Sequence, residues 1–254
     1  SGNYDVSTAY YAYSGKMLAE IAEVLGRKED AKRYAQIADC AGKAYLEAFT
    51  ENGKINSKRQ CQYVRPVQFG LLSGEEKQAA VADLDALVRE CGNHLNTGFL
   101  TTPYLCEVLA ENGYTETAYN VLLQEEAPGW LYEVRKGATT VWETWDGINE
   151  AGVPKDSLNH YSYGAIAGWL IEGVAGIRYT EKKIEIRPTI SGQLAHARAE
   201  YNSPKGKIIS AWKWEGEKVA VSITIPCNAE AVVTLPGREP KKLRAGEYSF
   251  EVTR

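Results

Sequence analysis

The hydrophobic pattern of this chain changes its period once, near Gly176, and that change constrains the fold more than any other feature. Over residues 7–125, apolar side chains recur at every third or fourth position, as on one face of an α-helix. Beyond Gly176 they recur at every second position, as in half-buried β-strands. The sequence therefore predicts a multidomain α and β protein, with a helical part over residues 1–176 and a β-domain over residues 177–254.

The helical part divides into pairs of helices joined by short, mostly glycine-containing turns. The first pair is STAYYAYSGKMLAEIAEVLG with KEDAKRYAQIADCAGKAYLEAF, and FLTTPYLCEVLAENG with TETAYNVLLQEE is a later one. Short connections make consecutive helices antiparallel neighbours. No fixed-period repeat of the TPR or ankyrin kind is present, so the hairpins favour a closed ring of helix pairs over a solenoid. Pro66, in RQCQYVRPVQFGLL, predicts either a kink in that helix or its true start.

The β-domain contains several short alternating runs separated by turns. KVAVSITIP sends Val219, Val221, Ile223 and Ile225 to one face, and SPKG is a good turn sequence. This spacing predicts a small antiparallel β-sandwich. Trp212 and Trp214 sit at alternate positions of one run and form either a lectin-like surface or part of a core, which we favour.

A long aromatic segment separates the last helices. EEAPGWLYEVRKGATTVWETWDGINEAGVPKD has three tryptophans and no sustained helical period. Loops of this length in compact domains are usually functional or disordered, and this one is too aromatic for disorder. Helical pattern returns in SLNHYSYGAIAGWLIEGVAG, with Ser157 as the expected N-cap.

The chemistry-bearing residues of this segment lie in GATTVWETWDG, residues 137–147. It combines two acids, Glu143 and Asp146, with two indoles, Trp142 and Trp145. Sugars bind aromatic faces through their CH patches and carboxylates through their hydroxyls, and glycosidases use carboxylate pairs. Spacing alone leaves two hypotheses equally open: a short strand with Glu143 facing solvent, or the floor of a sugar site.

Two histidines near helix starts are further candidates. His160 opens the last helix, and His94 is expected to open an earlier one after a glycine-containing turn. A lone histidine is more often a structural hydrogen-bonding group, yet a helix start beside an aromatic loop is where polar groups converge on a substrate. Tyr161 and Tyr163 supply either core or stacking surface.

Composition and motifs argue against several function classes. The net charge of −4 gives no reason to expect nucleic acid, and no apolar run is long enough to cross a membrane. Five scattered cysteines without CxxC spacing predict buried free thiols rather than disulfides or a zinc site. There is no Walker loop, GxGxxG, HExxH or GxSxG motif. We expect no cofactor and no metal.

Four segments occur in a familiar order: HLNTGFLTTPYL, APGWLYEVRKGATTVWETWDG, SLNHYSYGAIAGWLIEGVAGIR and KIEIRPTI. Together they resemble the C-terminal part of bacterial α-L-rhamnosidases of glycoside hydrolase family 78. The resemblance covers almost the whole chain and implies the later part of an (α/α)6 toroid followed by a C-terminal β-domain. It also implies single-displacement hydrolysis of terminal α-L-rhamnosides with inversion, with Glu143 as general base. His160 then contacts the sugar, and Trp142 and Trp145 lie in or beside the matched motif. Asp146 is expected to support the site, either as a second ligand for sugar hydroxyls or as an acid that orders the loop.

The resemblance also implies that part of the enzyme is missing. The family's general acid is a glutamate near the start of the toroid, and no such motif stands here. The periodicity predicts about seven helices, whereas six helix pairs close the ring. We therefore expect a fragment that is inactive alone, whose partners are an L-rhamnose-containing glycoside and the missing N-terminal half. PGWLY also stands where many relatives have PSWGY, which leaves leaving-group preference open.

Two alternative functions remain. One is another (α/α)6 exo-glycosidase, such as an unsaturated glucuronidase. The other is a non-catalytic carbohydrate-binding or scaffold module. The chain opens directly into helical pattern, as a cut inside a longer protein does, so the absence of a signal peptide does not indicate a compartment. A periplasmic or secreted location is favoured over a cytoplasmic one, and no residue pattern decides it.

Overall fold

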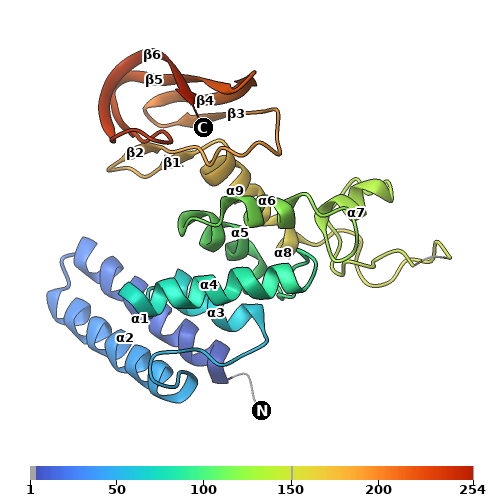
Figure 1. Ribbon diagram of the computed structural model, residues 1–254. Helices are drawn as coiled ribbons and strands as arrows, with labels where there is room; N and C mark the ends of the chain where they lie inside the picture. The colour runs from blue at the N-terminus through green and yellow to red at the C-terminus, as the bar shows by residue number, and fades with distance from the viewer. Residues whose placement is uncertain (1–3, 150, 254) are drawn as a thin grey trace. The chain divides into compact units, whose positions relative to one another are not determined.

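The computed structural model describes residues 4–149 and 151–253 (Figure 1). The chain divides into two compact units, residues 1–112 and 113–254.

The first unit is built of helices arranged in hairpins. Its helices are α1 (Tyr4–Val24), α2 (Lys28–Phe49), α3 (Gln60–Gln68), α4 (Gly74–Glu90) and α5 (Thr102–Glu111). Figure 1 shows α1 and α2 lying side by side along most of their length. Gly26, with φ of +71°, lies in the left-handed conformation between them and lets the chain reverse. The predicted helical hairpins are therefore confirmed.

Close packing of α1 on α2 depends on small residues. A Cβ atom added at Gly15 of α1 would lie 3.2 Å from the Cβ of Ala38 of α2, which is already tight. Beside this contact, Phe69 stacks on Tyr13 with ring centroids 4.4 Å apart. Ala9 and Tyr45 complete the buried centre of the unit. Small residues bring the two backbones together, and aromatic rings fill the space beside them.

A buried ion pair links the start of α1 to α3. Nη2 of Arg65 lies 2.5 Å from Oδ2 of Asp5, and both side chains are almost fully buried. The Arg65 Nη1 group also donates to Oγ1 of Thr101 at 3.0 Å. Pro66 occupies the last turn of α3, so it marks neither the start of the helix nor a break before its end.

The second unit begins with short helices. They are α6 (Thr115–Leu122), α7 (Trp130–Arg135), α8 (Tyr161–Gly164), α9 (Ile166–Trp169) and the π-helical turn η1 (Leu170–Val174). The short helix α7 lies inside the segment expected to have no helix. The N-cap of α8 is His160 rather than Ser157, because the His160 side chain accepts the N–H of Ser162.

Six strands follow and form the β-domain. They are β1 (Ile177–Tyr179), β2 (Ile184–Ile186), β3 (His196–Ser203), β4 (Gly206–Glu215), β5 (Lys218–Val233) and β6 (Lys241–Thr253). Their order in the sheet is β1-β2-β5-β4-β3, with β6 paired to β5. The sheet curls, because Tyr179 of β1 and Tyr201 of β3, at opposite ends of this order, have ring centroids 5.4 Å apart.

The strand pairing differs from the expectation in one respect. The β2–β5 pair is parallel, whereas the others are antiparallel. Strand β5 pairs with β4 through residues 218–224 and with β2 through residues 231–233. Between these stretches its register with β6 shifts, from Ile225 to Glu230. Pro226 falls in this irregular stretch and has no N–H to offer a ladder. The β-domain itself is confirmed.

The alternation along β5 supplies the core as predicted. Val219, Val221, Ile223 and Ile225 are each at most 3% exposed. Trp212 is 1% exposed, and its Nε1 donates to the carbonyl of Val174. Since Trp212 is part of the core, it is unavailable to a lectin-like surface.

The five cysteines are all free, and burial was predicted for each. Cys61 and Cys106 are buried, but Cys40, Cys91 and Cys227 are exposed. The expectation of buried thiols is therefore wrong for three of them.

Gly176 is expected to be essential for the link between η1 and β1. Its φ is +83°, and an added Cβ would lie 2.2 Å from the backbone nitrogen of Pro188. Gly176→Ala should therefore lower the free energy of unfolding by about 1–3 kcal/mol or more, measured by urea denaturation. Gly216→Ala is the control, because Gly216 has φ of +65° and open space around it. Equal losses in the two variants would contradict the clash.

Candidate functional site

Two segments singled out in the sequence are paired through their backbones in the second unit. The N–H of Glu143 donates to the carbonyl of Ser157 at 2.9 Å, and the N–H of His160 donates to the carbonyl of Val141 at 2.8 Å. The Thr140 hydroxyl donates to the carbonyl of Leu158. No strand forms over residues 138–147, so the strand hypothesis is wrong and a loop presents Glu143.

Glu143 is held at its side chain as well as at its backbone. Its Oε2 accepts the N–H of Ser157 at 3.2 Å, and the residue is half-buried. One residue, Ser157, thus fixes both the backbone and the carboxylate of Glu143. Within residues 4–149 and 151–253, Oε1 has no hydrogen-bond partner. One oxygen is anchored, and the other can accept a proton from a bound water.

His160 follows on the same paired segment. Its Nδ1 accepts the N–H of Ser162 at 3.4 Å, which caps α8. In a neutral imidazole that accepts at Nδ1 the proton sits on Nε2, so the second nitrogen is a donor. The ring stacks on Tyr161, with centroids 5.2 Å apart, and Tyr161 is 85% exposed. His160 is therefore placed next to an exposed aromatic face.

The two indoles of the loop differ in exposure. Trp142 is 2% exposed, so its ring has no surface left for a sugar, and its role in this structure is packing. Trp145 is half-buried between two rings. It meets Trp130 edge-on at 5.4 Å and stacks on Tyr163 at 4.0 Å. Trp130 and Tyr163 therefore hold the loop in place through their packing on Trp145.

Asp146 lies on the outside of the loop. Both of its carboxylate oxygens lie 3.2 Å from Nζ of Lys155, and both side chains are more than half exposed. The Lys155 N–H also donates to the carbonyl of Gly147 at 2.7 Å. An exposed pair of this kind contributes about 0–1 kcal/mol. Here the contacts of Lys155 with Asp146 and Gly147 bring these positions together.

Glu133, on α7, is a site residue that the sequence did not suggest. It is 3% exposed, and its Oε2 accepts the N–H of Trp142 at 3.1 Å. Burial raises the pKa of the Glu133 carboxyl to about 7, and the hydrogen bond from Trp142 acts in the opposite direction. The available signal was its spacing: Glu133 lies three positions after Trp130, on the same face of a short helix.

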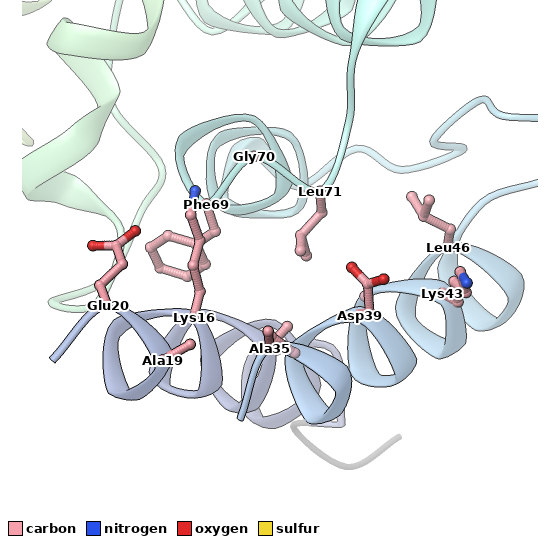
Figure 2. Close-up of a pocket in the computed structure, with 13 residues that line it drawn as sticks. Lys16, Ala19, Glu20, Ala35, Asp39, Lys43, Leu46, Phe69, Gly70 and Leu71 are labelled. Atoms are coloured by element: carbon pink, nitrogen blue, oxygen red, sulfur yellow. The ribbon is translucent and has the colours of Figure 1, made fainter. Parts of the chain in front are cut away.

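His94 and a surface hollow belong to the first unit. His94 does not open a helix, since it precedes α5 by eight residues; its carbonyl accepts Nε2 of Gln60. The surface hollow, of about 420 Å³, lies between α1, α2 and the end of α3. Figure 2 shows Ala19 and Ala35 on one side of it and Phe69 and Leu71 on the other. None of the predicted site residues lines it.

The described part of the chain has neither a cluster of metal ligands nor a membrane-spanning helix. No group of three or more His, Cys, Asp or Glu side chains there could hold a metal ion. No helix there is long and apolar enough to span a bilayer.

Two family models together match nearly the whole chain. The bacterial alpha-L-rhamnosidase 6 hairpin glycosidase domain matches residues 2–174. The chain belongs to the bacterial α-L-rhamnosidase family. The bacterial alpha-L-rhamnosidase C-terminal domain matches residues 173–249. The predicted resemblance is therefore confirmed.

Curated rhamnosidases align along the chain but extend well beyond it. An alpha-L-rhamnosidase of Formosa agariphila is 37% identical over 96% of this chain and 27% of its own length. One from Alteromonas sp. is 35% identical over 97% of this chain and 30% of its own length. The chain thus spans less than a third of either relative.

Solved rhamnosidase structures agree with the fold. The alpha-L-rhamnosidase of Aspergillus terreus has a TM-score of 0.94 at 30% identity, over 99% of this chain and 31% of that protein. The Streptomyces avermitilis alpha-L-rhamnosidase complexed with L-rhamnose has a TM-score of 0.90 at 30% identity, over 98% of this chain and 27% of that protein. The expected fold class, part of an (α/α)6 toroid followed by a β-domain, is confirmed.

The buried Glu133 is expected to make stability depend on pH. Because its pKa is raised to about 7, the folded chain keeps a proton that the unfolded chain loses near pH 4.5. Unfolding then releases this proton between those values, so the Glu133 contribution to the free energy of unfolding falls as pH rises from about 4.5 to 7. Glu133→Gln should lack that decline in urea titrations. A wild-type-minus-variant difference that stays flat across the window would contradict it.

Proposed function

We propose that this chain is part of an inverting exo-glycosidase that hydrolyses terminal α-L-rhamnosides, with Glu143 as general base. The observation that carries the proposal is the double anchoring of Glu143 by Ser157, which presents one carboxylate oxygen for chemistry. Family membership supports the substrate class, and a solved relative is a complex with L-rhamnose.

Inversion assigns a defined task to Glu143. A water attacks the anomeric carbon of rhamnose while the bond to the leaving oxygen breaks. Glu143 takes a proton from this water, and a second carboxylic acid protonates the leaving oxygen. The two carboxyl groups of inverting enzymes lie roughly 6.5–9.5 Å apart, which leaves room for the water. Holding Oε2 on the Ser157 N–H limits rotation of the carboxylate, so Oε1 keeps one direction toward that water.

The sugar contacts are proposed on the same loop pair. His160 donates from Nε2 to a rhamnose hydroxyl, and Trp145 and Asp146 lie beside the sugar site. Trp142 supports the loop through packing, because its indole is buried. We expect no cofactor or metal in this mechanism.

The general acid is proposed to lie outside these 254 residues, in an N-terminal half of the same protein. The share of each relative that the chain covers, 27–31%, supports this. So does α1: its Tyr4, Tyr11 and Leu18, with Leu25 just past its end, recur every seven residues and are each 44–74% exposed. A helix with such a stripe is expected to pack against another helix. We place the boundary between the toroid part and the β-domain at residues 176 and 177, where η1 gives way to β1.

The proposal is tested in a full-length protein that carries this chain, with p-nitrophenyl α-L-rhamnoside as substrate. Glu143→Gln should lower kcat by roughly a hundredfold or more, because the amide cannot accept the proton of the attacking water. The control is Glu181→Gln, at an exposed turn between β1 and β2, which should keep wild-type kcat. Near wild-type turnover by Glu143→Gln would remove Glu143 from the mechanism.

A second arm tests the missing acid. The 254-residue chain alone should release no p-nitrophenol above background, although it carries Glu143. Turnover by this chain would show that its own residues supply the acid. Failure of the full-length protein on α-L-rhamnosides, with hydrolysis of another aryl glycoside, would favour a different exo-glycosidase.

A further inference from the structure

Glu133 binds the loop of the candidate base at two places. Its backbone carbonyl accepts the N–H of Ala138 at 3.0 Å, just past the end of α7, and Gly137 takes the left-handed conformation that this closure needs. Its Oε2 accepts the N–H of Trp142 at 3.1 Å. One residue thus spans the loop from its beginning to the position before Glu143.

Helix α7 is itself fixed in place, so Glu133 is a firm point of attachment. The Trp130 indole donates to the carbonyl of Tyr163 at 3.0 Å. A Cβ atom at Gly129 would lie 2.7 Å from the carbonyl oxygen of Gln124, which leaves no room for a side chain before the helix. The buried face of α7 is formed by Trp130 and Glu133.

A carboxyl on this buried face has a cost that packing does not explain. Oε1 of Glu133 is buried and has no hydrogen-bond partner among the described residues. An apolar side chain of similar size would avoid that cost but could not accept the N–H of Trp142. The favourable contribution of Glu133 is therefore the hydrogen bond that it accepts from the loop.

We propose that Glu133 is a positioning residue for Glu143: its buried carboxyl holds the Trp142 backbone, and so sets the direction of the neighbouring base. This rests on the proposed function of Glu143. Ser157 holds Glu143 from one side of the loop, and Glu133 holds Trp142 from the other. Loss of the Glu133 contact leaves the loop held from one side, through Ser157 at Glu143, His160 at Val141 and Leu158 at Thr140.

The charge of Glu133 acts on the pKa of a neighbouring titratable group, Tyr163 on α8. Burial raises the pKa of the Tyr163 hydroxyl, an interaction with Trp145 lowers it, and the charge of Glu133 raises it. Tyr163 stays neutral near pH 7, so Glu133 is the group of this pair that titrates there.

The test compares Glu133→Leu with Glu133→Gln in the full-length protein. Leucine removes the acceptor, so kcat should fall roughly ten- to a hundredfold while KM changes by less than about twofold. Glutamine keeps an acceptor oxygen for Trp142, so kcat should stay within about threefold of wild type. The Gln variant should also lose an inflection near pH 7 in the kcat profile, which a purely structural role does not predict.

Two further measurements keep the outcomes separate. Amide hydrogen exchange of the peptide covering residues 137–147 should be about tenfold faster in Glu133→Leu, and unchanged in Glu125→Gln, which breaks only an exposed pair with Arg135. If Glu133→Leu does not fold, the pH profile of kcat in Glu133→Gln decides whether Glu133 is a positioning residue.

Wild-type kcat in Glu133→Leu, or an unchanged inflection in Glu133→Gln, would overturn the inference. If the wild-type protein cleaves no rhamnoside, the proposed function fails instead. The exchange arm then still shows whether Glu133 holds the loop.

Discussion

The candidate site depends on the backbone pairing between residues 141–143 and residues 157–160. Three contacts make it: Glu143 N–H to Ser157, Ser157 N–H to the Glu143 carboxylate, and His160 N–H to Val141. Two motif segments separated by a polar excursion become neighbours through this pairing. Backbone groups supply most of it, so it constrains the loop without requiring particular side chains at every position.

Buried charge is handled differently in the two units. In the first, Arg65 and Asp5 form an ion pair at 2.5 Å and Thr101 accepts from a second guanidinium nitrogen, while Nε of Arg65 is buried without a partner among the described residues. Such a pair is costly to break but does little beyond holding its helices together. In the second, Glu133 has one satisfied oxygen and one buried oxygen without a partner. A buried carboxyl with a pKa raised to about 7 is more typical of functional sites than of structural ones.

The periodicity of the sequence predicted much of the fold. Helical hairpins and the core face of β5 follow from local spacing, and both are present. The parallel β2–β5 pairing was not predictable, because it joins strands far apart in sequence. The curling of the sheet is likewise a property of all strands together.

The site was less predictable than the fold. Glu143 and His160 came from motifs, but spacing could not show that Trp142 is buried or that Glu133 lies behind it. Ser157 contributes its backbone N–H and carbonyl, which every residue other than proline has, so its type carried no signal. Sequence identifies residues with useful side chains more readily than it identifies the groups that orient them.

The central claim is that Glu143 deprotonates the water that attacks rhamnose from the face opposite the leaving group. The most direct measurement is azide rescue of Glu143→Ala in the full-length protein, with the product anomer assigned by NMR. Azide is a nucleophile that needs no base, so it should restore turnover and give β-L-rhamnosyl azide from an α-rhamnoside. An α-configured azide, or hydrolysis at the wild-type rate without azide, would contradict the account.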